Sequence, residues 1–155
     1  MKALLTALVL LNLAVASRAA ETSKLYADTF LSYSTPNFKA GDWGYGVGVG
    51  YQVSKFWSAD LRLAHTGLDF ENRGVSEIGG RLVARMPFQF LSPYTFLGGT
   101  YRTELDDWRI RPGAGIEFSP SKRWTGLSLF AEGNLDANTK GANAYQCTGG
   151  VRLRF

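Results

Sequence analysis

The sequence contains very few residues of the kinds that build redox or metal sites. It has one cysteine, Cys147, and one histidine, His65, among 155 residues. A single cysteine excludes a disulfide within the chain, and one cysteine with one histidine offers no metal-ligand spacing. We therefore expect no metal and no cofactor.

Charge is also scarce. Charged residues make up 19% of the chain, whereas about a quarter is usual for a soluble globular protein. Apolar residues reach 45%, with 10 Phe, 7 Tyr, 4 Trp and 18 Gly, which is too apolar and too aromatic for a disordered chain. A mean hydropathy of −0.10 argues against a helical membrane protein. The combination favours closely packed strands with an apolar exterior.

Long apolar runs are absent after residue 20, so no transmembrane helix is expected there. The first residues differ: Met1-Lys2 is followed by an apolar run over residues 3–16 and by small residues at Ser17 and Ala19. This run is shorter than the roughly 20 residues that a spanning helix needs. The pattern predicts a cleavable signal peptide over residues 1–19 and a mature domain over residues 20–155, with an uncleaved anchor as the alternative.

A nucleic-acid partner is not expected, although the formal net charge is +4. Removal of Lys2 and Arg18 with the leader lowers this charge, and the chain has no long run of Lys or Arg. An exported protein would not meet nucleic acid in the cell.

The remaining sequence alternates with period two, which indicates strands with one apolar face. The clearest case places aromatic and branched residues between four glycines, over residues 44–51. Similar segments are 25–33, 44–53, 57–63, 77–86, 94–102, 108–118, 127–135 and 145–155, although the faces of the fifth are not assignable from its pattern. Each approaches the 9–11 residues of a tilted transmembrane strand. We predict an all-β, eight-stranded, antiparallel, up-and-down transmembrane β-barrel.

The predicted connections differ in length and polarity. Residues 54–55, 87–93 and 119–123 are short or marked by proline, whereas 35–42, 67–74, 103–107 and 136–143 are mostly longer and more polar. Short turns on the periplasmic side and longer loops outside are typical of outer-membrane barrels. An even number of strands also places both ends of the barrel on the periplasmic side.

The face opposite the apolar one carries both signs of charge, and its basic residues are all arginine. Arginine suits dense internal ion pairs because its planar fork serves several carboxylates. We predict that this face fills the lumen as a charge network of Asp28, Asp60, Arg62, Glu77, Arg81, Arg85, Arg109, Arg111, Glu117, Glu132, Arg152 and Arg154. In the alternative, a soluble barrel, the same face would be solvated and the apolar face would point inward.

Two further features favour the membrane. Aromatic residues lie near the predicted strand ends, as in the interfacial girdles of membrane barrels. The last five residues of the chain also alternate, with Val151, Leu153 and Phe155 separated by arginines. With the leader and the eight strands, this ending resembles the small bacterial outer-membrane barrels of the OmpA/OmpX type. The resemblance implies that these three residues form a C-terminal assembly signal.

The resemblance further implies an outer-membrane location, lipid and lipopolysaccharide as surroundings, and the outer-membrane assembly machinery as a partner. We expect a structural or interaction protein with a filled lumen, no wide pore and no enzyme activity. The extracellular partner is not indicated by any loop. One alternative is a soluble periplasmic carrier similar to lipocalins.

The other alternative is a lipid-acting acyl hydrolase, since some small barrels with that activity carry His and Ser two residues apart on the membrane face. Here His65 is followed by Gly67 where that Ser would be, and the sequence shows no other Ser partner. We therefore expect His65 to be an interfacial residue at a strand end.

Overall fold

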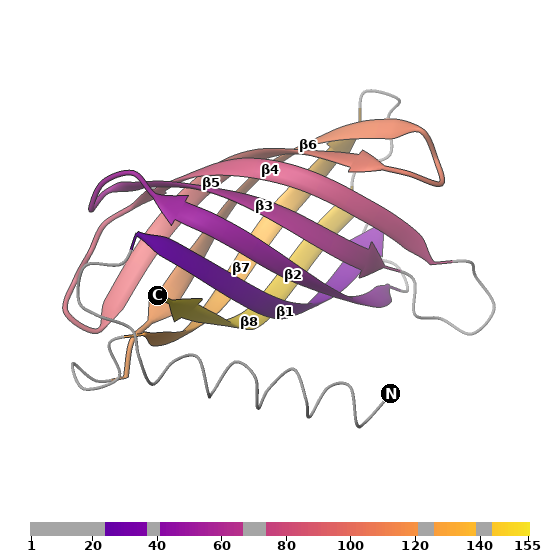
Figure 1. The fold of residues 1–155 in the computed structure, drawn as a ribbon. Coiled ribbons are helices and arrows are strands. Elements are labelled where there is room, and N and C mark those ends of the chain that lie inside the picture. Colours follow the sequence, from indigo (N-terminus) through magenta and orange to yellow (C-terminus); the bar gives the residue numbers. More distant parts are fainter. Residues whose placement is uncertain (1–23, 37–40, 67–73, 121–125, 139–143) are drawn as a thin grey trace.

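The computed structural model describes residues 24–36, 41–66, 74–120, 126–138 and 144–155. Its strands are β1 (Leu25–Pro36), β2 (Asp42–Gln52), β3 (Trp57–Thr66), β4 (Val75–Arg85), β5 (Leu91–Arg102), β6 (Asp107–Phe118), β7 (Leu127–Asn138) and β8 (Ala144–Arg154). Each strand pairs with the next in sequence and β8 pairs with β1, which closes an antiparallel barrel (Figure 1). The predicted eight-stranded architecture is confirmed. The predicted signal peptide, residues 1–19, lies outside the described residues.

The strands are long enough for a bilayer. They contain 10 to 12 residues each, and a tilted strand needs about 9–11 to cross. In Figure 1 the end of β8 lies at the same end of the barrel as the β2–β3 and β4–β5 connections, while the β5–β6 connection lies at the other end. We call these the terminal end and the loop end. Within the described part of the chain, no helix combines the length and hydropathy required to cross a membrane.

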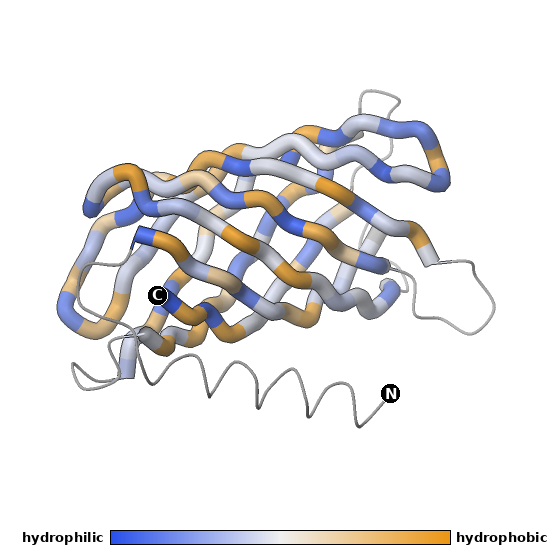
Figure 2. The backbone as a smooth tube through the Cα atoms, in the orientation of Figure 1, coloured by the Kyte–Doolittle hydropathy of each residue, from blue (hydrophilic) through white to orange (hydrophobic). Residues whose placement is uncertain are grey.

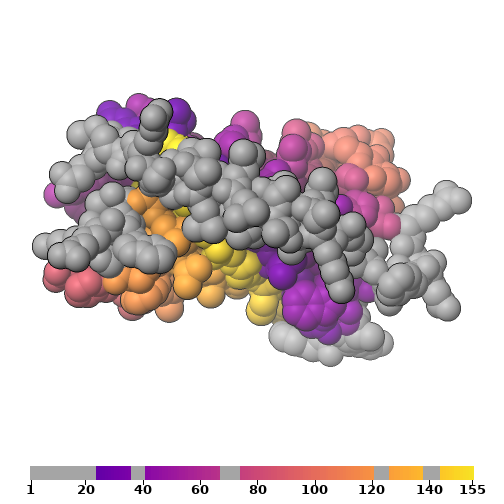
Figure 3. All heavy atoms as spheres, turned by 60° about the horizontal axis from the view of Figure 1, so that its bottom comes forward, coloured from indigo at the N-terminus to yellow at the C-terminus, as the bar shows by residue number. Residues whose placement is uncertain are grey.

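The apolar face of the strands points outward and the charged face points inward. Leu61 and Trp108 leave 63% and 67% of their surface exposed, whereas Glu117 and Arg152 are each 1% exposed. The alternation is visible along the strands in Figure 2. Figure 3 shows part of the outer surface, where β8, in yellow, lies beside β1, in indigo. The soluble-barrel alternative requires the opposite arrangement of faces and is wrong for this chain.

Aromatic rings inside the barrel lie over glycines of a neighbouring strand. A Cβ built on Gly115 would lie 2.7 Å from Cζ of Tyr94 and 2.7 Å from the backbone oxygen of Ala131. The same arrangement occurs for the pairs Tyr26–Gly50, Phe30–Gly46, Phe96–Gly113 and Phe130–Gly150. These glycines make room for large side chains in a narrow lumen, where an eight-stranded barrel has little spare width.

Several predicted boundaries were wrong by a few residues. Pro93, which was predicted in a connection, lies inside β5. Pro112 lies inside β6, within the strand predicted over residues 108–118, although proline interrupts most strands. The described β6–β7 pairs stop at Ile110 and resume at Gly113, so no partner requires the N–H that Pro112 lacks. Asp107 and Asp136, predicted in loops, belong to β6 and β7.

The faces of the fifth strand are now assigned. Tyr94, Phe96 and Thr100 are buried, whereas Leu97 is exposed on the outside. Two adjacent glycines, Gly98 and Gly99, had obscured this alternation in the sequence.

Candidate functional site

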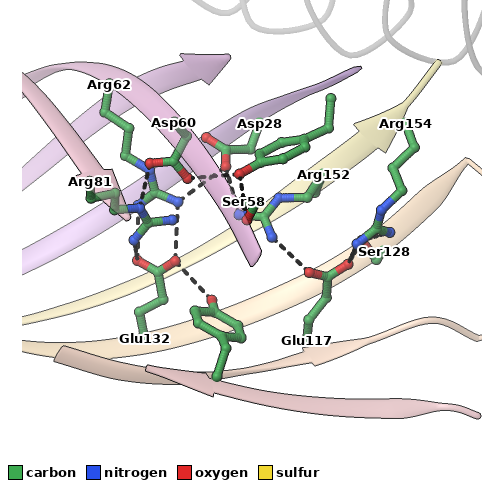
Figure 4. Close-up of polar contacts among 12 residues, drawn as sticks. Asp28, Ser58, Asp60, Arg62, Arg81, Glu117, Ser128, Glu132, Arg152 and Arg154 are labelled. Carbon is green, nitrogen blue, oxygen red and sulfur yellow. Dashed lines mark hydrogen bonds and ion pairs between the residues drawn. The ribbon is translucent and has the colours of Figure 1, made fainter. Parts of the chain in front are cut away.

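A continuous network of ion pairs fills the lumen from the terminal end to the middle of the barrel (Figure 4). Its central carboxylate is Glu132 on β7. Arg62 donates to both Glu132 oxygens at 2.9 and 3.1 Å, and Arg81 donates to Oε2 at 2.8 Å. The hydroxyl of Tyr94 donates to Oε1 at 2.8 Å. Side chains from three strands, β3, β4 and β5, therefore donate to one buried carboxylate on β7.

Two aspartates extend the network across the lumen. Asp60 accepts from Nε of Arg81 at 2.7 Å, and Asp28 accepts from Nη2 of Arg62 at 3.1 Å. Asp28 also accepts from Nη2 of Arg152 at 2.9 Å. The last contact carries the network toward the terminal end.

Glu117 on β6 is the second hub. It accepts from Nη1 of Arg152 at 2.7 Å, from the hydroxyl of Ser128 at 2.7 Å, and from Arg154. The Nη1 atom of Arg85 lies 3.3 Å from Oε2 of the same carboxylate. We call these nine charged residues the terminal-end network: Asp28, Asp60, Arg62, Arg81, Arg85, Glu117, Glu132, Arg152 and Arg154.

Aromatic faces support the arginines. The guanidinium of Arg62 lies 4.7 Å from the ring centre of Phe30, and that of Arg81 lies 4.5 Å from Phe96. Arg152 lies 4.5 Å from the ring of Tyr26. These cation–π contacts fill the lumen and partly replace water around the charges.

A separate cluster, the loop-end network, closes the other end. Glu77 contacts Nε of Arg102 and Nη2 of Arg111, both at 2.8 Å. Asp136 contacts Arg111 at 3.1 Å and Arg109 at 3.3 Å. Asp107 contacts Nε of Arg109 at 3.1 Å and completes the set of three carboxylates and three arginines.

Between the networks lies a cavity of about 50 Å³. Arg62, Arg81 and Glu132 line it from one side, and Glu77 and Arg111 from the other. A space of this size has room for a few water molecules and is too small to form a channel. The described lumen is therefore filled by side chains, with a small cavity in the middle.

The structure places all 12 residues of the predicted charge network in these two clusters, each with an ion-pair partner. Sequence reasoning missed three charged members, Arg102, Asp107 and Asp136. Strand parity could have found Asp136, which lies four residues after Glu132. The inward aromatic residues were also missed, because a large apolar side chain gives no signal of facing a polar lumen.

The three residues of the predicted assembly signal have mixed exposures. Val151 is exposed on the outside and Phe155 is half-buried. Leu153 has the outward parity but is only 2% exposed. On the adjacent strands, Leu153 pairs with Ala27 and Leu127. Its position in the alternation predicted an exposed side chain, and that prediction was wrong.

His65 is the penultimate residue of β3, lies on the outer face and has a serine beside it, which the sequence did not show. The β3–β4 register pairs it with Ser76, whose Oγ lies 3.3 Å from Nδ1 of His65. No carboxylate contacts His65 among the described residues; Glu104 instead accepts from the Ser76 backbone N–H at 2.7 Å.

Hydrogen bonds from the Thr103 hydroxyl and from that N–H lower the pKa of Glu104 to about 2. In the described chain, no group of three or more His, Cys, Asp or Glu side chains could hold a metal ion.

Comparison with known proteins agrees with this architecture. A family model described as "Outer membrane protein beta-barrel domain" matches residues 3–155. The chain belongs to this family. It is therefore an integral outer-membrane barrel protein with an ion-paired interior. A comparison with curated protein sequences gives no match.

Solved structures of similar fold come from several bacteria. The N-terminal barrel domain of OprF from Pseudomonas aeruginosa has a TM-score of 0.65 at 12% identity, covering 84% of this chain and 97% of that domain. Ail, the attachment invasion locus protein of Yersinia pestis, has a TM-score of 0.55 at 15% identity, with coverage of 86% and 97%. Neisserial surface protein A has a TM-score of 0.54 at 15% identity, with coverage of 84% and 96%. At these identities the likeness shows the fold alone.

Proposed function

We propose that this barrel has a structural or interaction role in the outer membrane and forms no wide pore. The observation that supports this proposal is the pair of ion networks across the lumen. Each of their carboxylates and arginines has at least one ion-pair partner, and buried charges held in this way resist displacement by water or solute. Only the small central cavity separates the two networks.

A flux assay tests the filled lumen. The full chain is refolded into liposomes, and swelling is measured in an isotonic pentose solution beside liposomes that contain a general porin. We expect swelling no faster than in protein-free liposomes. Swelling at a rate similar to that of the porin would refute the proposal.

The proposed partners are the lipid and lipopolysaccharide around the barrel and the machinery that assembles it. The wide apolar exterior supports the first, since exposed side chains such as Leu61 and Trp108 need a hydrocarbon environment. The alternation of Val151, Leu153 and Phe155 supports the second. We expect a barrel that migrates differently on gels before and after boiling and stays in the outer-membrane fraction.

A lipid-acting hydrolase is the second candidate, and the contact between Ser76 and His65 favours it. A serine beside a histidine can act as nucleophile and base on an ester. The absence of a carboxylate on His65 within the described residues makes the pair incomplete relative to a triad. Release of fatty acid from lipopolysaccharide by the full chain, lost in both His65→Ala and Ser76→Ala, would establish this activity; no release by the parent chain would exclude it.

A further inference from the structure

Arg85 stands apart from the other arginines in the lumen. Each of the other seven lumen arginines in the described part of the chain donates at least one hydrogen bond to a carboxylate. The side chain of Arg85 is 5% exposed, and its Nε and Nη2 atoms are buried without a hydrogen-bond partner. Its remaining nitrogen, Nη1, lies 3.3 Å from Glu117.

Glu117 has at most one acceptor position left for Arg85. Its two oxygens already accept from Arg152, Arg154 and Ser128. A carboxylate offers about four lone-pair positions, and three are occupied by donors with hydrogen-bond geometry. The contact with Arg85 is consequently an ion pair at the limit of the carboxylate's capacity.

The charge balance points to the same residue. The terminal-end network contains five arginines and four carboxylates, whereas the loop-end network contains three of each. The ion-paired residues of the described lumen thus include one more arginine than carboxylate. That excess coincides with Arg85, which has two unpartnered nitrogens, whereas Arg62, Arg81, Arg111 and Arg152 have one each.

Buried guanidinium groups without partners are rare, because the loss of hydration is uncompensated. We propose that Arg85, together with Arg154 and Arg152, forms a binding site for a small monovalent anion, such as chloride, at the terminal end of the lumen. One negative charge balances the network, and Nε and Nη2 of Arg85 supply the two donors. Arg85 is the last residue of β4, so the site lies close to the periplasmic mouth.

The test measures stability of the folded full chain in two sodium salts at one ionic strength. Chloride is compared with gluconate, which is too large for a side-chain-filled lumen, and urea unfolding is followed in detergent micelles. A ligand that binds only the folded state raises the folded-to-unfolded ratio by a factor of 1 + [L]/Kd. We expect that ratio to rise about tenfold for each tenfold rise in chloride above Kd, and to stay flat in gluconate.

Two variants locate the effect. Arg85→Met keeps the length of the side chain and should abolish the difference between the salts. Arg102→Met removes a lumen arginine from the other network, and should keep the difference. Equal unfolding midpoints of the parent chain in the two salts would overturn the proposal. This comparison uses the parent chain alone, so it tests the proposal even if Arg85→Met does not fold. A chloride effect that persists undiminished in a folded Arg85→Met barrel would also overturn it.

Discussion

Gly115 and Gly133 offer a direct test of how the lumen is packed. They lie on the adjacent strands β6 and β7, one position apart in register, and face opposite sides of the wall. A Cβ on Gly115 would meet Tyr94 Cζ and the Ala131 oxygen at 2.7 Å, and the Tyr94 hydroxyl at 2.8 Å. A Cβ on Gly133 would meet nothing within 4 Å. The same substitution by alanine should therefore have different results at the two sites.

The expected cost at Gly115 has two parts. Overpacking a close contact costs about 1–3 kcal/mol, since a backbone oxygen cannot move aside as a flexible side chain can. Displacement of Tyr94 would also weaken its hydrogen bond to the Glu132 carboxylate, and such charged bonds contribute about 1.5–3 kcal/mol. We expect Gly115→Ala to lower the free energy of unfolding by about 2–4 kcal/mol.

At Gly133 we expect the alanine substitution to leave the free energy of unfolding unchanged or to raise it. Replacing glycine by alanine in a strand stabilises by about 0.5–1 kcal/mol, because the unfolded chain loses conformational freedom. Both variants are measured by urea unfolding of the refolded barrel, with tryptophan fluorescence and gel mobility as independent probes. Equal destabilisation of the two variants would refute the assignment of inner and outer faces, as would a neutral Gly115→Ala.

Three further outcomes are expected. Glu132→Ala leaves two buried arginines without their shared carboxylate and should destabilise the barrel by about 3–5 kcal/mol, measured by the same unfolding assay; a loss below 1 kcal/mol would contradict the hub role. Phe155→Ala should reduce the amount of protein in the outer-membrane fraction, and normal levels would argue against an assembly signal. The depressed pKa of Glu104 means that its contribution to stability is complete above its ordinary value near 4.5 and is lost as the pH falls toward 2. The amide resonance of Ser76 should titrate with a midpoint near 2, and a midpoint near 4.5 would show that the hydrogen bonds to Glu104 do not form in solution.

Much of the fold was predictable because strand parity is a local property. Successive side chains point to opposite faces, so the alternation of Val47 and Val49 with glycines identified a strand and its two surfaces without any knowledge of its neighbours. The two faces of the fifth strand could not be assigned in the same way, since Gly98 and Gly99 carry no side chain on either face. Pro93 also misled, because a proline's compatibility with a strand depends on whether a neighbour needs its N–H.

The charged face was recognised as a set, but its pairing was not. Which carboxylate serves which arginine depends on contacts between residues far apart in sequence, such as Asp28 with Arg152. The contact between His65 and Ser76 is of the same kind, since it arises from the β3–β4 register and not from a motif.

The sequence by itself determined that the chain forms eight alternating strands and that one face carries arginines and carboxylates in near balance. Only the tertiary structure decided that this face is the inside, how its charges divide into two networks, and that Arg85 is left with unpartnered donors. The physical reason is that the alternation of side chains is a local property of each strand. Burial, ion pairing and residual charge arise only when eight strands have closed around a common lumen.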